Sequence, residues 1–278
     1  MKNFTTILIG LLLTAFLTVT LIFANGFFGN PISKAIVNYK VKGYISTTYP
    51  DLNLQVEKAQ YNFKFSSYSV NAYSPSSLDT HFNIYFDSYG NVERDDYDSY
   101  VLGKFNTRSR LEDSYRNLTD AVFDSDSFPY DTYLCFGELT TLQDSISEED
   151  EILGLPQHGY DLDAIELDGD YDIKQLGKTA GQLVFYTESE DRSVDNAVKI
   201  LNNVKQIFDE ADVPFCTISF VLEMPRDIRK EQGIVGGTDE FRVKSFPYSE
   251  IGSEQFKEKL IEANQKLMDY YAILDSQK

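Results

Sequence analysis

The residues Asp79, Thr80 and His81 place an acid, a hydroxyl and one of the two histidines of the chain side by side. Such a triplet could supply a nucleophile with its general base, or part of a metal site. Both chemistries need convergent partners. The other histidine, His158, lies far along the chain in an acidic segment, so the triplet by itself carries little catalytic signal.

Alternation along the following strand pattern gives the triplet a simpler interpretation. The aromatic and aliphatic residues Phe82, Ile84 and Phe86 fall on one face of a strand, and His81 falls on the opposite, more polar face. Asp79 then occupies a turn position from which a carboxylate can cap local N–H groups. We therefore expect a structural role for the triplet.

An acidic region at residues 144–172 suggests the binding of a hard cation such as calcium. Calcium sites need several carboxylates on a sharply turned loop, with glycine at the sixth position of an EF-hand loop. That sixth position holds Glu166 or Ile173, depending on the start of the loop. An irregular calcium site and a solvated acidic edge both stay open. The carboxylates concerned are Asp161, Asp163, Glu166, Asp168, Asp170 and Asp172.

Other motifs assign no catalytic, cofactor-binding or metal-binding residue. The stretch EQGIVGGTDEF lacks the Gly-Lys-Ser/Thr ending of a phosphate loop, and we expect a flexible hairpin loop there. No GxSxG, HExxH or SxxK motif occurs. Dispersed carboxylate pairs of a glycosidase kind stay possible among 44 acidic residues. The residues of this glycine-rich stretch and its basic flank are Arg226, Arg229, Lys230, Gly233, Gly236 and Gly237.

Two cysteines, Cys135 and Cys216, lie in apolar, strand-like runs. They could meet on neighbouring strands and form a disulfide outside the cell, or stay buried as small inert side chains. The sequence leaves both possibilities open.

The formal charge of −19 is concentrated in one part of the chain. Residues 117–173 contain sixteen Asp and Glu but no Lys or Arg, so this stretch carries −16 and the rest only −3. The electric field of this negative charge repels nucleic acids and other polyanions, which argues against nucleic-acid binding. It favours a basic partner or bound cations.

The amino-terminal segment has the length and composition of a membrane anchor. No charged residue separates Lys2 from Lys34, and the apolar core at residues 5–24 would span about 30 Å as a helix. The core is longer than that of a cleaved signal peptide, and the Ile-Phe-Ala sequence before Asn25 is a poor cleavage site. We expect an uncleaved, single-pass anchor with an extracytoplasmic body, although lysines on both flanks weaken the predicted orientation.

Residues 31–125 combine a helix with strands. Helical spacing of apolar residues predicts a helix from Ile36 to Thr48, ahead of Pro50. Alternation then predicts an antiparallel meander of about four strands between residues 52 and 97. A second helix is expected at residues 107–123, with its packing partner left open. The helix and meander together predict a small α+β domain.

Residues 126–278 also combine strands with helices. Strands are predicted at residues 133–136, 164–167, 183–187, 217–224 and 241–246, and the acidic stretch before residue 164 is expected to be a loop. Helices are predicted near residues 172–179, after the cap Ser193, and after the cap Ser253. The order suggests a ferredoxin-like sandwich. The predicted fold class is therefore α+β, with a transmembrane anchor at 1–30 followed by two small α+β domains, 31–125 and 126–278.

A family resemblance accompanies these patterns. The chain resembles the YfjL-like family of Gram-positive bacteria over residues 30–123, through the SPSS-x-DTHF and NT-x-x-RLE segments, and more loosely through VKILNNVKQIFDEADVPFCTISFVLEMP. The resemblance implies a membrane-anchored protein and supplies no catalytic residues. The first domain is also distantly similar in layout to PepSY-type extracytoplasmic modules, which implies binding of protein partners.

Together these observations favour a non-catalytic, protein-binding or regulatory module anchored in the membrane, with an envelope protein as partner and no cofactor. Two alternatives stay open. One is a cation- or ligand-responsive envelope sensor that uses residues 144–172, and the other is a hydrolase built on dispersed carboxylates.

Overall fold

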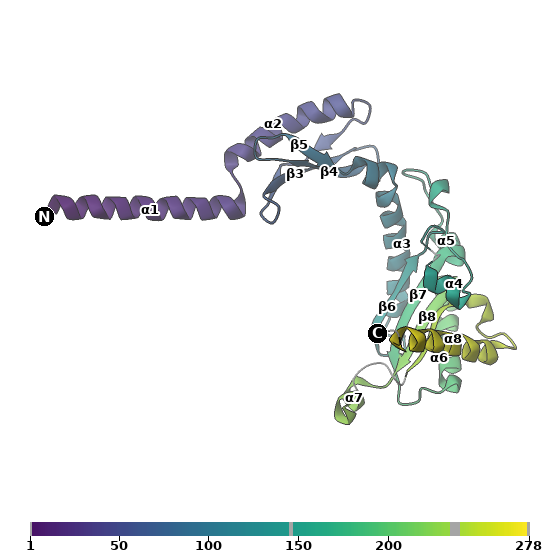
Figure 1. Cartoon of the computed structure of the whole chain (residues 1–278). Helices are drawn as coiled ribbons and strands as arrows, with labels where there is room; N and C mark the ends of the chain where they lie inside the picture. Colours follow the sequence, from purple (N-terminus) through teal and green to yellow (C-terminus); the bar gives the residue numbers. More distant parts are fainter. Residues whose placement is uncertain (1, 145–146, 234–239, 277–278) are drawn as a thin grey trace. The chain divides into compact units, whose positions relative to one another are not determined.

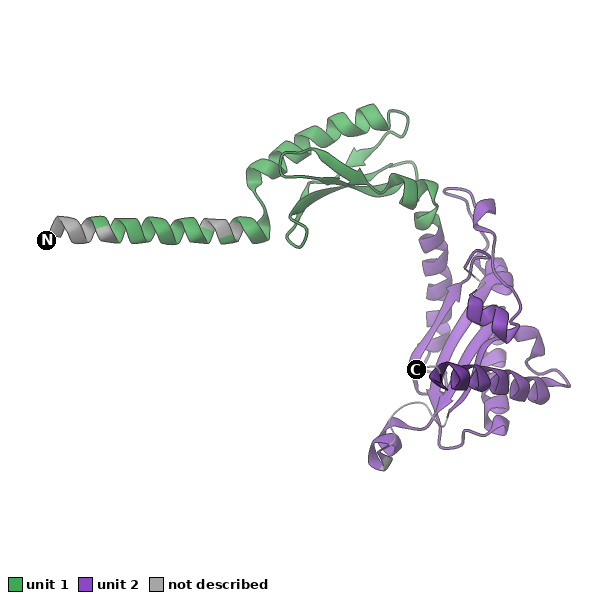
Figure 2. Ribbon diagram, viewed as in Figure 1, with its two compact units in different colours: residues 1–107 green, residues 108–278 purple. Residues whose placement is uncertain are grey.

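The computed structural model describes residues 2–144, 147–233 and 240–276 of the chain (Figure 1). The protein is a mixed α+β molecule with an amino-terminal apolar helix and two β-sheets. It divides into two compact units, Met1–Thr107 and Arg108–Lys278 (Figure 2). Each unit is described separately below.

Helix α1 spans Lys2–Phe28, and its described side chains are exposed. The hydroxyls of Thr14, Thr18 and Thr20 each donate to the carbonyl four residues earlier, at 2.9 Å. These bonds satisfy polar groups within the helix, as an apolar environment requires. In the part of the chain that the structure describes, one helical segment, within Ile9–Thr48, is long and apolar enough to cross a membrane.

The first unit continues with helix α2, Pro31–Thr48, which Asn30 caps by accepting the Ile32 N–H at 2.8 Å. Five antiparallel strands follow, in the order β1-β3-β4-β5 with β2 also paired to β3. The predicted helix and antiparallel strands are present, but only β2 to β5 follow one another as a meander, because β1 pairs with β3 and not with β2. The strands are β1 (Gln55–Val56), β2 (Gln60–Asn62), β3 (Ser67–Tyr73), β4 (His81–Phe86) and β5 (Val92–Asp95).

The core of the first unit lies between α2 and the sheet. Val37 and Val41 of α2 are fully buried against Val70, Phe82 and Ile84 of the central strands. Alternation along β4 buries every second side chain, so the face assignment made from sequence is correct.

The second unit contains a four-stranded sheet with the order β6-β7-β8-β9. Strands β7 and β8 are parallel neighbours, while the outer pairs are antiparallel. Helix α6, Val194–Glu210, connects β7 to β8, and Ser193 caps it as predicted. The strands are β6 (Thr132–Leu139), β7 (Gly181–Glu188), β8 (Thr217–Glu223) and β9 (Phe241–Pro247).

The remaining helices of this unit are α4, α5, α7 and α8, together with most of α3 (Phe105–Phe123). Helix α3, whose partner the sequence left open, contributes Val122 and Phe123 to the core formed by the sheet and α6. The Tyr115 hydroxyl of the same helix donates to the Pro214 carbonyl at 2.9 Å. The other helices span Glu148–Leu153, Ile173–Ala180, Arg226–Gln232 and Phe256–Ser276.

The predicted ferredoxin-like layout is not confirmed. In a split βαβ arrangement another strand separates the two parallel strands. Here β7 and β8 pair directly along their whole length, from Gln182–Thr217 to Glu188–Glu223. Sequence periodicity predicts that strands exist, whereas their order depends on non-local pairing.

Two local predictions for the second unit were wrong, and one helix was not predicted. Residues 164–167 form no strand, because only Ile165 of that stretch is buried and the chain turns at once. The acidic stretch predicted as a loop begins with α4, which a capping box between Ser147 and Asp150 starts. The basic flank, for which the sequence predicted no element, forms α7, which extends to Gln232 at the start of the predicted loop and ends at Gly233 with a left-handed φ of 66°.

Candidate functional site

The triplet Asp79-Thr80-His81 forms the entry to strand β4. His81 is exposed, while Asp79 and Thr80 are buried. The amide of Asn106 donates to the carbonyls of Asp79 and His81 at 2.9 and 2.6 Å, and the Thr80 N–H donates to Ser77 Oγ at 2.9 Å. These contacts give the triplet a structural role in the first unit.

Both cysteines are free. Cys135 lies on β6 and Cys216 directly precedes β8, with β7 between these strands. Two strand spacings correspond to about 10 Å, and a disulfide needs Cα atoms closer than about 7 Å. Burial raises the pKa of each thiol. The two cysteines therefore act as small side chains of the fold.

Two carboxylates of the acidic run, Asp161 and Asp172, cap local structure. The Asp161 carboxylate accepts the Asp163 N–H at 3.0 Å, and the Asp172 carboxylate accepts the Gln175 N–H at 3.0 Å. Among the described residues, no group of three or more His, Cys, Asp or Glu side chains is arranged to hold a metal ion.

The basic flank of the glycine-rich stretch is largely paired with acidic residues at the end of the sheet. Arg229 contacts Glu223 at 2.7 Å, and Arg226 Nε contacts Glu188 at 3.3 Å. The Arg226 guanidinium also lies 4.2 Å from the centre of the Tyr133 ring. Gly236 and Gly237 lie outside the described residues.

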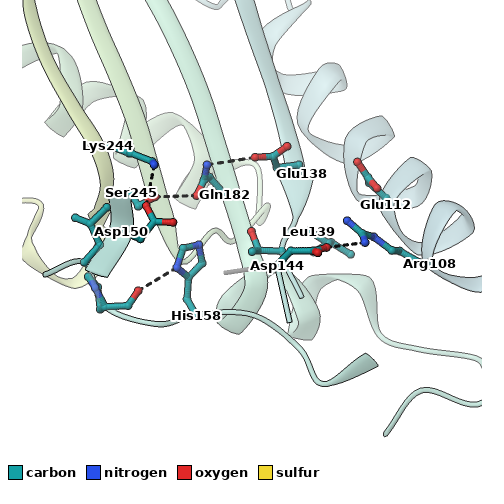
Figure 3. A pocket seen from close by; sticks show the side chains of 13 residues that line it. Arg108, Glu112, Glu138, Leu139, Asp144, Asp150, His158, Gln182, Lys244 and Ser245 are labelled. Carbon is teal, nitrogen blue, oxygen red and sulfur yellow. Dashed lines mark hydrogen bonds and ion pairs between the residues drawn. The ribbon is translucent and has the colours of Figure 1, made fainter. Parts of the chain in front are cut away.

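A polar pocket in the second unit is the strongest candidate site (Figure 3). Leu183 of β7 faces the core against α6, so its neighbour Gln182 points to the opposite face of the sheet, where the pocket lies. The cavity has a volume of about 220 Å³. Its lining includes Arg108, Glu138, His158, Gln182, Lys244 and Ser245.

Gln182 is the centre of the hydrogen-bond network in this pocket. Its amide nitrogen donates to Glu138 at 3.2 Å, and its amide oxygen accepts the Ser245 hydroxyl at 3.1 Å (Figure 3). The Thr217 hydroxyl lies 3.4 Å from the same oxygen and 3.1 Å from His158 Nε2. Gln182 of β7 thus contacts β6, β8 and β9, and Thr217 links this network to the loop that contains His158.

Two cations at the pocket are already paired with carboxylates. Lys244 lies 2.8 Å from Asp150 and 2.9 Å from Glu149, while Arg108 lies 2.6 Å from Asp144. Burial acts to raise the pKa of Asp150, but hydrogen bonds from Lys244 and Ser147 outweigh it and lower this pKa. The pairing fixes the Lys244 ammonium beside α4.

Glu138 has a different environment. Burial raises the pKa of its carboxyl group, and the nearby Glu112 carboxylate raises it further, although Arg116 and Arg108 partly oppose this shift. The carboxyl accepts a hydrogen bond from an amide, Gln182, which stabilises its negative charge less than a cation would. Glu138 is thus a carboxylate suited to receive a positive charge.

The His158–Thr217 pair resembles a base beside a hydroxyl nucleophile, with His158 Nδ1 3.3 Å from the Pro156 carbonyl. However, only 1% of Thr217 is exposed, and its hydroxyl already contacts Gln182. Substrate would have no access to this hydroxyl. The pair therefore holds the loop before Tyr160 against the sheet.

Sequence reasoning did not select Glu138, Gln182 or Lys244, and it considered His158 only as a distant partner for His81. A signal was present for Glu138 and Gln182, which are polar residues beside apolar runs of their strands, whereas Lys244 occupies an ordinary polar position of an alternating strand. Their convergence depends on the order of β6, β7 and β9, which the sequence does not reveal.

Comparisons with known proteins place the whole arrangement in a family. Residues 1–96 match the family described as YfjL-like, N-terminal domain, and residues 114–262 match the YfjL-like C-terminal domain. No curated protein and no solved structure matches the chain. The two matches cover more than half of the 278 residues and confirm the resemblance noted from sequence. The chain belongs to the YfjL-like family.

Proposed function

We propose that the protein is a single-pass, membrane-anchored binding module whose body is extracytoplasmic and whose second unit binds another protein without catalysing a reaction. Helix α1 is the anchor, and an envelope protein is the partner. The main support for the proposal is that the polar side chains of the pocket already form hydrogen bonds with one another. In addition, the Thr217 hydroxyl, which lies beside His158, is buried.

The chemistry of the pocket indicates which group of a partner would bind there. The carboxyls of Glu112 and Glu138 interact unfavourably with each other, and burial adds to the cost of ionising Glu138. A lysine or arginine side chain of the partner would relieve this cost by charge pairing. The acidic field of residues 117–173 would also steer a basic surface toward the second unit.

Site-specific photo-crosslinking in membranes of cells that express the full chain tests this proposal. A crosslinker at Leu155, which lines the pocket, is compared with one at Lys199, an exposed residue of α6 on the other face of the sheet. We expect a discrete adduct with one envelope protein from Leu155 only, and its loss when Glu138→Gln is added. Equal adducts from both positions, or none from Leu155, would contradict the proposal.

Orientation is tested separately by protease treatment of intact cells with a tag at the carboxyl terminus. Loss of the tag without permeabilisation is expected for an extracytoplasmic body. A tag that is cleaved only after permeabilisation would show that the body is cytoplasmic, and the partner would then be sought in the cytoplasm.

A further inference from the structure

The turn between β2 and β3 carries two exposed phenylalanines. Phe63 and Phe65 are 62% and 72% exposed, and Lys64 lies between them. Turns that face water are normally built from Gly, Pro, Asn, Asp and Ser. A pair of large aromatic side chains at a hairpin tip is therefore costly in water and indicates a second, less polar surface.

This tip lies beside the end of helix α1. The rings of Phe27 and Phe63 have centroids 6.0 Å apart, and β3 begins directly after this tip (Figure 1). Phe27 and Phe28 are themselves exposed. The exposed rings of Phe27 and Phe63 thus lie side by side, and the exposed residues Phe28 and Phe65 lie close to them in the chain; these four residues are called the aromatic patch.

Close contacts fix the hairpin to the end of α1. Gly29 has a φ of 72°, and a Cβ placed on it would lie 2.5 Å from Tyr61 Cγ, so only glycine allows this approach. The next residue, Asn30, donates its N–H to the Tyr68 hydroxyl at 2.8 Å. Since Tyr61 and Tyr68 belong to the two strands of the hairpin, the helix end and the hairpin are held together.

The position of Phe27 along α1 indicates how deep in a membrane the aromatic patch would lie. Residues 5–24 would fill the apolar core of a bilayer, about 30 Å thick. Phe27 lies three residues beyond this core, which places it about 5 Å further along the helix axis. That position is the interfacial layer of the membrane, and the contact with Phe27 brings Phe63 to the same level.

We propose that the β2–β3 hairpin tip is a second membrane contact, in which Phe63 and Phe65 insert into the interfacial layer of the bilayer that α1 crosses. This inference rests on the proposed anchoring by α1. Aromatic rings at this depth are favourable, and Lys64 between them reaches the lipid phosphates with its ammonium group. The first unit is then held at the membrane by two points instead of one, which restricts its rotation about the helix end.

The absence of tryptophan from the natural sequence permits a direct test. Single-tryptophan variants of the full chain are placed in vesicles whose lipids carry bromine near the headgroup or deep in the acyl chains. Phe16→Trp reports on α1, and Phe65→Trp, with Phe63→Trp as a second variant, reports on the tip. Leu78→Trp is the matched control, because Leu78 is 71% exposed but lies in the turn at the opposite end of β3.

We expect deep bromines to quench Phe16→Trp, and shallow bromines to quench Phe65→Trp and Phe63→Trp with a blue shift of their emission. Leu78→Trp should keep the emission of a residue in water. Quenching of Phe16→Trp without quenching of either tip variant would overturn the second contact and leave the anchor intact. Loss of quenching at Phe16→Trp would instead overturn the anchoring itself, and a blue-shifted but unquenched tip would indicate a protein partner.

Discussion

At the residue scale, Glu138 is the side chain of the pocket that we expect to lower the stability of the fold while serving in binding. It extends from an apolar strand into a pocket where burial and Glu112 both oppose its ionisation. No requirement of the strand itself favours a carboxyl group there, since a neutral amide could accept the same hydrogen bond from Gln182. Groups with perturbed pKa values in a cavity are candidates for binding roles.

Glu138→Gln is expected to stabilise the second unit at neutral pH by about 0.5–2 kcal/mol, the usual gain when a costly functional group is replaced. The pKa of Glu138 is higher in the folded protein than in the unfolded chain, where it is about 4.3. Ionisation of Glu138 therefore lowers the free energy of unfolding as the pH rises through the range between these two pKa values. The gain should therefore vanish below about pH 4. Thermal unfolding of both proteins across this pH range measures it.

Glu262→Gln is the matched control for this pH series. Glu262 is exposed and pairs with Lys266 one turn away on α8, at 3.0 Å. Removing this pair should change the free energy of unfolding by less than about 0.5 kcal/mol. A Glu138→Gln variant that is less stable than the natural protein at pH 7 would contradict the assignment of Glu138 as a strained carboxylate.

At the element scale, the contact between α3 and β6 depends on one glycine. The Gly137 N–H donates to Thr119 Oγ1 at 3.0 Å, and Thr119 is fully buried. A Cβ at position 137 would lie 2.4 Å from Thr119 Cγ2. Because a β-branched residue in a helix has restricted rotamers, Thr119 has little freedom to move aside.

Gly137→Ala is therefore expected to destabilise the second unit by about 1–3 kcal/mol, the cost of overpacking a closely packed contact. Denaturant unfolding of the full chain measures the loss. Gly43→Ala serves as the control, because nothing lies within 4 Å of a Cβ at that position of α2. The control should stabilise the first unit by up to about 1 kcal/mol. Equal tolerance of both substitutions would show that α3 and β6 do not require this close approach.

At the scale of the whole molecule, the chain contains two compact units with separate hydrophobic cores. Ile84 is fully buried in the core of the first unit, and Leu201 is fully buried in the core of the second. Each core belongs entirely to residues of its own unit. Independent cores of this kind normally give separate cooperative unfolding transitions.

Calorimetry of the full chain in detergent micelles should resolve two transitions. Ile84→Ala and Leu201→Ala should each cost about 2–5 kcal/mol, because each leaves a cavity in a closed core. Each variant should lower one transition and leave the other unchanged. A single transition that moves with both variants would mean that the two units unfold as one.

Local sequence signals accounted for much of the secondary structure. The 20-residue apolar run predicted α1, alternation predicted the strands of the first sheet, and Ser193 marked the start of α6. These features depend on side-chain periodicity and capping between near neighbours, which any stretch of sequence displays. The short helices α4 and α7 were not predicted, because six or seven residues show too little helical periodicity in their apolar side chains.

The sequence by itself determined the anchor-like helix, the acidic charge distribution and the mixture of helices and strands. Only the tertiary structure decided which residues meet. It placed β7 between the strands of Cys135 and Cys216, brought Glu138 and Lys244 to Gln182, and set Phe63 beside Phe27. The physical reason is that strand order and packing join residues far apart in the chain, and no local pattern encodes such pairings.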